Sequence, residues 1–184
     1  ATFKAVQIGG PSGGCLTEKH LDEPLDFDSV KKFNAIVGSG GMVVMDDHTC
    51  MVEVARFFMS FTQRESCGKC VPCRIGLGQL SALMGQVLDG TGTMLTIDTI
   101  EKTARAIVAS ADCAIGRDAA QLVLSGFEGF RDDYEEHVQH HRCLASLQNP
   151  VPCVALCPAG VDIPGYMALV GAGRYADAVR LIRK

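Results

Sequence analysis

The sequence has no tryptophan, and aromatic residues make up only 6% of its 184 residues. It has no apolar run near the roughly 20 residues that a membrane helix needs, so we expect no direct membrane insertion. Basic residues are not in excess, because the net charge is −4, and we therefore expect no nucleic-acid partner. The N-terminus shows no secretory signal pattern. With 47% hydrophobic residues, the chain can still bury a substantial core.

Cysteine, in contrast, is abundant, with nine residues in the chain. An odd number clustered as C-x2-C-x2-C and C-x3-C-P favours metal ligation over a secreted disulfide framework. Such thiols persist in a reducing compartment, so we expect a cytoplasmic protein. The chain starts at Ala1 without an initiator methionine, and a helical pattern continues to Lys184 without a stop signal. We expect a segment of a longer polypeptide.

The first 48 residues favour short strands and turns. Residues 3–8 and 42–45 carry the apolar residues of strands, and glycine-rich turns lie at 9–14 and 38–41. The first turn lacks the Gly-Lys-Ser/Thr ending of a phosphate loop, so we interpret it as a structural turn. Because two or three strands alone are marginally stable, residues 1–48 are expected to complete a sheet that begins upstream.

Residues 49–140 show helical periodicity. A first helix follows a candidate cap at Thr49, a second covers 73–88, a third begins near Thr96, and a fourth covers 117–140. Short connections between four helices predict an antiparallel bundle. The fold class is therefore mainly α with a small α+β N-terminal part.

Prolines separate residues 141–184 as a third unit. Two short helices are expected there, near 164–171 and 174–183. The expected organisation is a partial sheet domain over 1–48, a four-helix bundle over 49–140 and a short helical tail over 141–184.

The strongest chemical signal is the loop with Cys67, Cys70 and Cys73, which Cys113 complements from a distant segment. Three thiols within seven residues and a fourth from elsewhere are the ligand set of a [4Fe–4S] cluster. Gly68 and Pro72 would shape the loop so that the sulfurs converge. The cations Lys69 and Arg74 are candidates for balancing the negative charge of the cluster.

Three other interpretations of these cysteines remain open. They could be buried free thiols, since cysteine is among the most buried residue types. They could bind zinc, although zinc sites usually pair two C-x2-C knuckles. Cys67 and Cys70 could form a redox disulfide, which would need a thioredoxin-like context that the sequence does not show.

The run from Glu65 to Gly76 resembles the cluster motif of the NADH-binding flavoprotein subunit of respiratory complex I. The same module occurs in NAD-linked hydrogenases and formate dehydrogenases. Phe3 to Cys15, with Gly38 to Asp47, resembles the soluble-ligand-binding β-grasp domain of that subunit. The resemblance covers about residues 1–140. It implies that Cys67, Cys70, Cys73 and Cys113 are the ligands, although the sequence around Cys113 matches the usual motif of the family less closely.

The resemblance also implies a place in an electron path. Electrons would pass from NAD(P)H to FMN, both bound by a domain upstream of this segment, then to the cluster and on to partner subunits. Those partners would be a thioredoxin-like [2Fe–2S] subunit and a ferredoxin-like, hydrogenase or formate dehydrogenase subunit. The segment would not be catalytic alone. The alternative is a non-enzymatic, zinc-stabilised adaptor that joins larger subunits.

The tail resembles the start of the glutamate-synthase small subunit and its relatives, in which a helical domain carries two [4Fe–4S] clusters before FAD and NADPH domains. Cys143, Cys153 and Cys157 match ligand positions of that family. Ser146 stands where a further cysteine is expected, and other ligands would lie downstream. The alternative is a helical docking appendage whose thiols bind nothing in this segment.

Several other polar residues have a simpler interpretation. Cys15 and Cys50 are expected to be core thiols. The remaining candidates are expected to be solvated and belong to two sets: the histidines His48, His137, His140 and His141, and an acidic face of Asp132, Asp133, Glu135 and Glu136.

Overall fold

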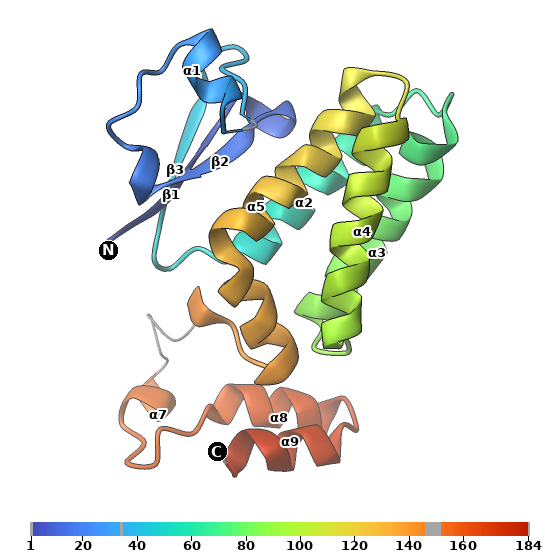
Figure 1. Cartoon of the computed structure of the whole chain (residues 1–184). Coiled ribbons are helices and arrows are strands. Elements are labelled where there is room, and N and C mark those ends of the chain that lie inside the picture. Colours follow the sequence, from blue (N-terminus) through green and yellow to red (C-terminus); the bar gives the residue numbers. More distant parts are fainter. Residues whose placement is uncertain (1, 34, 146–151, 184) are drawn as a thin grey trace.

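The computed structural model describes residues 2–33, 35–145 and 152–183. A small sheet, a helical bundle and a short helical tail follow one another along the chain (Figure 1). The sheet lies beside the bundle, and the tail packs below its lower end (Figure 1). The expected fold class, mainly helical with a small N-terminal sheet, is confirmed.

The sheet has three antiparallel strands in the order β2-β1-β3. They are β1 (Phe3–Ile8), β2 (Gly14–Thr17) and β3 (Met42–Asp46). The sequence pattern predicts β1 and β3 but not β2. The short 3-10 turn η1 (Gly10–Ser12) joins β1 to β2 after Gly9, whose φ of 77° favours glycine. The glycine-rich run is therefore a hairpin connection, in keeping with its interpretation as a structural turn.

Two short elements fill the connection from β2 to β3. The 3-10 turn η2 (Glu18–His20) follows β2 directly. Helix α1 (Phe27–Lys31) comes next, and the Asp26 carboxylate accepts hydrogen bonds from two backbone N–H groups of its first turn.

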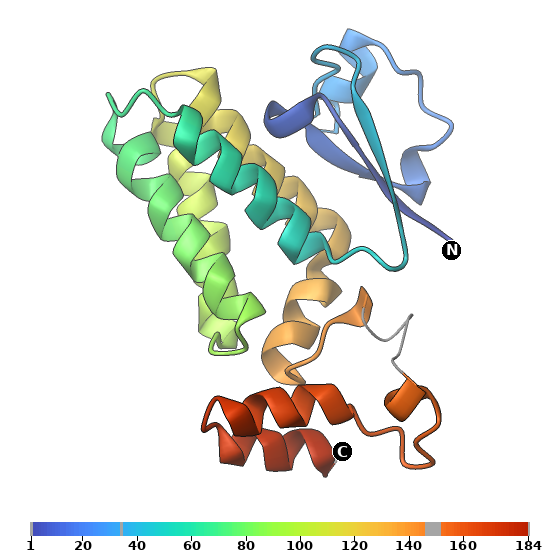
Figure 2. The same ribbon diagram turned by 180° about the vertical axis from the view of Figure 1, so that it is seen from behind.

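Four amphipathic helices make the bundle: α2 (Met51–Glu65), α3 (Leu77–Leu88), α4 (Met94–Ser110) and α5 (Ala114–Gln139). Figure 2 shows α2 running alongside α5, with α3 beside them. Apolar residues at helical spacing from all four helices meet in one core. Its largest fully buried members are Met59, Leu77, Leu80, Met84, Ile97, Ile100 and Tyr134.

Several expected helix details differ in the structure. Cys50, not Thr49, is the residue before α2. Helix α4 begins after Thr93, ahead of the expected start near Thr96, since the two threonines form a reciprocal cap. Helix α5 begins at Ala114 rather than 117, with non-helical φ/ψ at Phe130.

The sheet is attached to α5 by polar as well as apolar contacts. Ser125 Oγ of α5 accepts a hydrogen bond of 3.3 Å from the Cys15 backbone N–H of β2. Lys4 Nζ of β1 lies 2.7 Å from Asp133 Oδ2 of α5. Ala5, Cys15, Met45, Met51 and Leu122 form the apolar cluster between these parts.

The tail contains α7 (Pro152–Ala155), α8 (Ile163–Gly171) and α9 (Tyr175–Ile182). Helices α8 and α9 correspond to the two short helices expected near 164–171 and 174–183. They lie side by side below the bundle (Figures 1 and 2). Arg174 joins them to the bundle, because its guanidinium donates to the backbone oxygens of Asp89 and Gly90. Among the residues described, no helix is both apolar enough and long enough to span a membrane.

Candidate metal centre

The two cysteine-bearing connections lie at the same end of the bundle. One joins α2 to the helical segment before α3 and carries Cys67, Cys70 and Cys73. The other is the short connection from α4 to α5 and carries Cys113. In an antiparallel bundle, alternate connections return to the same end. Figure 1 shows both at the upper end, so two segments far apart in the sequence share one surface.

Two contacts join these connections directly. The backbone N–H of Asp112 donates a hydrogen bond to the Cys70 sulfur, which is the largest cause of a lowered pKa of the Cys70 thiol. Gly116, in the first turn of α5, lies against Cys73. A Cβ built on Gly116 would stand 3.2 Å from Cys73 Cβ and 3.5 Å from Cys73 Sγ. The segment around Cys113 therefore packs on the three-cysteine loop.

The three-cysteine loop is held by its own side chains. Gly68 has a φ of 72°, which permits the sharp turn between Cys67 and Cys70. Ser66 Oγ lies 3.1 Å from Cys73 Sγ and accepts the Gly68 N–H at 3.2 Å. The Arg74 guanidinium donates to the Gly68 carbonyl oxygen at 2.6 Å, so this residue organises the loop as well as adding charge.

The helical turn between the loop and α3 is wider than a turn of α-helix. Residues Pro72–Gly76 form a π-helical turn, η3, a geometry often found at functional sites. It buries Cys73, which is 5% exposed, while Cys67 and Cys113 remain exposed and Cys70 is half-buried. Cys113 itself is the residue before α5 and makes no side-chain cap. Cys113 is thus placed at the amino end of α5.

A single zinc ion and a [4Fe–4S] core would need different spacings between the four sulfurs. A tetrahedral zinc ion with Zn–S bonds of about 2.3 Å would hold its sulfurs about 3.8 Å apart. Among the described residues, only two groups of three or more metal-binding side chains have all their ligand atoms within 4.8 Å of one another, and neither includes a cysteine of this site. A [4Fe–4S] core is larger, since each thiolate binds a different iron.

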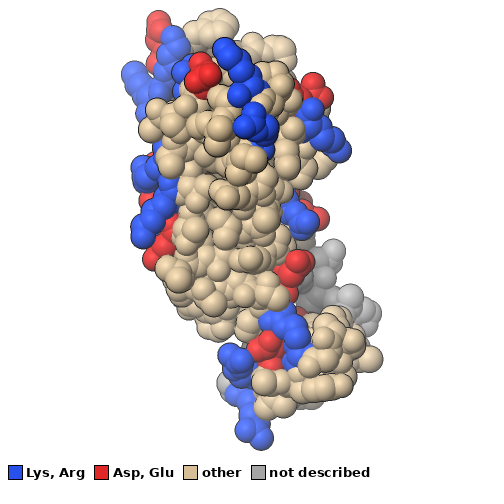
Figure 3. Space-filling view, turned by 90° about the vertical axis from the view of Figure 1, so that its right-hand side faces the viewer, with Lys and Arg blue, Asp and Glu red and all other residues tan. Residues whose placement is uncertain are grey.

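The surface around the two connections is basic. Figure 3 shows mainly Lys and Arg among the charged side chains at the upper end of the bundle, whereas the middle of this face carries few charges. Lys69 and Arg74 of the first connection and Arg117 of α5 are exposed there. Positive charge near the cysteines suits an anionic cluster.

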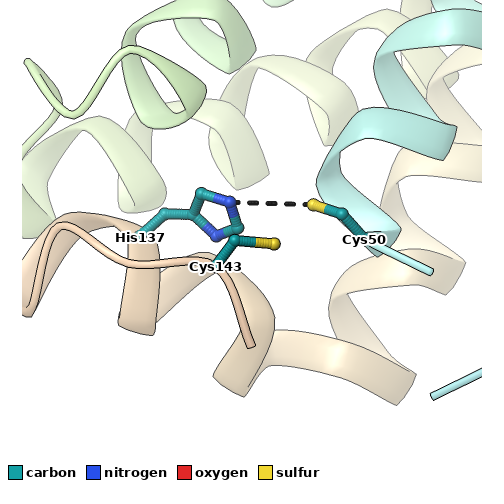
Figure 4. Close-up of side chains that lie close together, drawn as sticks. All are labelled: Cys50, His137 and Cys143. Carbon is teal, nitrogen blue, oxygen red and sulfur yellow. Dashed lines mark hydrogen bonds between the residues drawn. The ribbon is translucent and has the colours of Figure 1, made fainter. Parts of the chain in front are cut away.

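The tail cysteines are in different surroundings. Cys143 lies beside Cys50 and His137, as Figure 4 shows. Cys153 is exposed. The Cys157 sulfur accepts backbone N–H groups of Val161 and Ala159, which lower the pKa of its thiol. Cys153 and Cys157 belong to neither compact ligand group in the described part of the chain. Ser146 lies outside the described residues.

Three expectations about polar residues need correction. His137 is only 6% exposed, so it is buried rather than solvated. Asp133 is 5% exposed and paired with Lys4, so it does not belong to an exposed acidic face. Cys50 is half-buried and next to other potential ligands, unlike Cys15, a core thiol whose burial raises its pKa to about 12.

The sequence did contain a signal for two of these corrections. His137 follows Tyr134 by three residues and Asp133 by four, which places all of them on the inward side of α5. The acidic composition of the segment obscured that periodicity. Nothing in the local sequence indicated that Cys50 lies near His137, because 87 residues separate the two.

Residues 53–137 match the protein-family model described as the NADH-ubiquinone oxidoreductase-F iron–sulfur binding region. The matched stretch contains the four cysteines and most of the bundle. This part of the chain is thus a 4Fe–4S binding region of the type found in that oxidoreductase and in NAD-reducing hydrogenases.

Curated relatives are similar over a larger share of the chain. The NADP-reducing hydrogenase subunit HndC of Solidesulfovibrio fructosivorans is 42% identical over 160 residues, which cover 87% of this chain and 32% of that protein. The F 2 subunit of NADH-quinone oxidoreductase in Rhizobium meliloti (strain 1021) is 36% identical over 140 residues, covering 76% of this chain and 33% of that protein. The chain spans about a third of the length of these relatives.

The fold is similar to that of a solved enzyme. A chain in the crystal structure of NAD+-reducing [NiFe]-hydrogenase in the H2-reduced state aligns with a TM-score of 0.68 and 28% sequence identity. The alignment covers 78% of this chain and 24% of that one. The air-oxidised state aligns with a TM-score of 0.67.

Proposed function

Because residues 53–137 match the iron–sulfur binding region of NADH-ubiquinone oxidoreductase-F, we propose that this chain relays single electrons through one [4Fe–4S] cluster. The proposed ligands are Cys67, Cys70, Cys73 and Cys113. The observation that carries the proposal is the packing of Gly116, at the start of α5, against Cys73, where an added Cβ would stand 3.5 Å from Cys73 Sγ. It brings the segment with the fourth cysteine onto the loop with the other three.

The residues around the four cysteines suit an anionic, redox-active group. When bound, the cluster supplies a site that takes up and releases one electron at a time. The Asp112 N–H favours negative charge on the Cys70 sulfur, because it lowers the pKa of that thiol. Ser66 and Arg74 keep the loop in one conformation through bonds to Cys73 and Gly68. Such contacts to the sulfurs are the means by which a protein sets a reduction potential.

Exposure of the site favours transfer to a partner. Cys67 and Cys113 are exposed, whereas Cys73 faces the bundle core. A redox centre at the surface of a rigid bundle can lie close to a second centre in another domain or subunit. The basic surface around it would favour partners with acidic docking faces.

The wider setting is part of the proposal. The relatives named above are subunits of an NADP-reducing hydrogenase and of NADH-quinone oxidoreductase. We place FMN and NAD(P) in a domain upstream of this segment, and the electron acceptor in a thioredoxin-like [2Fe–2S], ferredoxin-like, hydrogenase or formate dehydrogenase subunit. The whole would be a cytoplasmic NAD(P)-linked oxidoreductase complex.

The proposed division of the chain into three parts fits the same setting. We propose the end of a β-grasp domain over 1–48, the cluster-binding bundle over 49–140, and the start of a glutamate-synthase-like iron–sulfur domain over 141–184, with further [4Fe–4S] clusters and FAD downstream. The Cys157 sulfur, which accepts backbone N–H groups, has the surroundings of a cluster ligand.

The test is anaerobic reconstitution of the chain with iron and sulfide. We expect about four iron atoms per chain, broad visible absorbance and a paramagnetic signal after reduction. Cys70→Ser should lose the signal and most of the iron. Cys15→Ser, which changes a buried thiol outside the site, is the control and should retain both.

The zinc-stabilised adaptor gives the opposite result. Zinc is colourless and has no redox activity, so a chain that carries zinc on these four cysteines and assembles no iron would refute electron relay. A Cys70→Ser variant with full iron content and an unchanged reduced spectrum would refute the ligand assignment.

A further inference from the structure

A second group of potential metal ligands lies at the opposite end of the bundle. Cys50 precedes α2, His137 is in the last turn of α5, and Cys143 is in the connection that leaves α5. Their ligand atoms all lie within 4.8 Å of one another. Figure 4 shows a ring nitrogen of His137 facing the Cys50 sulfur, with the Cys143 sulfur on the same side of the ring. Three segments distant in sequence thus place two sulfurs and one nitrogen around one point.

The tautomer of His137 is determined by its hydrogen bond. Its Nδ1 lies 2.6 Å from the backbone oxygen of Asp133. A carbonyl oxygen can only accept, so Nδ1 carries a proton, and in the neutral ring Nε2 presents the lone pair that can bind a metal. Nε2 lies 3.7 Å from Cys50 Sγ. Metal-binding histidines usually make this kind of bond through the nitrogen that does not touch the metal.

The separation of these two atoms suits one bound ion. Zinc lies about 2.3 Å from a thiolate and about 2.0–2.1 Å from an imidazole nitrogen, which in tetrahedral geometry gives a sulfur–nitrogen distance of about 3.6 Å. The 3.7 Å between Cys50 Sγ and His137 Nε2 agrees with that spacing. The site thus needs little movement to accept a metal ion.

The surrounding structure positions Cys50 and His137. The Asp133 carboxylate, one turn before His137, accepts hydrogen bonds from Lys4 Nζ at 2.7 Å and from the Met51 backbone N–H at 3.1 Å. Met51 is the residue after Cys50. The same aspartate therefore orients the histidine through its carbonyl and positions the start of α2 through its carboxylate. Such support is typical of built metal sites.

We propose that Cys50, His137 and Cys143 bind a single zinc ion, separate from the four-cysteine site. Two thiolates and an imidazole are ligands that zinc prefers, and the two negative charges neutralise the ion. The ion would connect the residue just before α2 to the last turn of α5 and to the segment that follows α5. Cys143 would then serve this ion rather than an iron–sulfur cluster of the tail.

The experiment measures zinc and iron together in the purified full chain, expressed with added zinc and loaded with its cluster. We expect about one zinc atom per chain in addition to the cluster iron. Cys50→Ala and His137→Ala should each lose the zinc and keep the iron. His140→Gln changes an exposed histidine at the same helix end and should keep both metals.

A second measurement needs no variant. X-ray absorption at the zinc edge of the wild-type chain should show sulfur at about 2.3 Å and imidazole nitrogen at about 2.0–2.1 Å. A shell of oxygen alone would overturn the proposal. It would also be overturned by a wild-type chain without zinc, by zinc that survives both substitutions, or by iron lost in their place.

Discussion

Lys4 Nζ and Asp133 Oδ2 lie 2.7 Å apart although 129 residues separate them in the sequence. The side chains are 15% and 7% exposed, so the pair is largely removed from water. It connects the first strand to the last helix of the bundle. Removing one partner leaves the other charge buried without compensation.

Lys4→Met should therefore destabilise the chain strongly. We expect the free energy of unfolding to fall by about 3 kcal/mol, measured from the denaturant midpoint with iron content held constant. The control is Arg105→Ala, which removes an ion pair with Glu101 from an arginine that is 61% exposed. That change should cost less than about 1 kcal/mol. Equal effects of the two variants would contradict the structural role of Lys4.

Gly116→Val should impair cluster loading. A Cβ at this position would stand 2.9 Å from Ala111 Cβ and 3.2 Å from Cys73 Cβ, closer than side chains normally approach. The start of α5 would have to move away from the three-cysteine loop. We expect iron content to fall to less than half after reconstitution.

The matched control for that prediction is Gly78→Ala in α3. An added Cβ there would meet only the side-chain nitrogen of Gln63, at 3.4 Å. Alanine also favours a helix by up to about 1 kcal/mol over glycine. This variant should bind iron normally. Full iron loading in Gly116→Val would show that the two connections need not approach each other.

Arg174→Ala should release the tail helices from the bundle. The guanidinium donates to the Asp89 backbone oxygen at 2.7 Å, and hydrogen bonds of a charged group contribute about 1.5–3 kcal/mol. We expect faster hydrogen exchange in α8 and α9 and unchanged iron content. Arg180→Ala is the control, because Arg180 also contacts Asp177 but is 70% exposed. Similar exchange in both variants would contradict this account.

Glu136 should titrate below the usual range of a glutamate. A hydrogen bond from Arg142 is the largest cause of its lowered pKa. A carboxylate with a lowered pKa stabilises the fold above about pH 4.3, and that contribution is lost as the pH falls through the lower folded value. Carbon NMR of the carboxyl group should show this in the wild-type chain, and Arg142→Gln should return the midpoint toward about 4.3. An unchanged midpoint would exclude Arg142 as the cause.

The helices were largely predictable, whereas their boundaries were not. Leu77, Leu80 and Met84 repeat at helical spacing, and the structure buries all three. The start of α4 was expected near Thr96 but lies after Thr93, because these two threonines cap the helix reciprocally. Strand β2 was missed because it follows directly after a glycine-rich turn and is only four residues long.

Local spacing in the sequence determined the three-cysteine loop, the helical class and the apolar faces, because these depend on residues within a few turns of one another. Only the tertiary structure decided which distant groups meet. Three such contacts depend on how the helices pack and on which end of the bundle each connection lies. They are the Asp112 N–H at the Cys70 sulfur, Lys4 at Asp133 and Cys50 at His137. Periodicity states which face of a helix is buried, but not which residue of another element will lie against it.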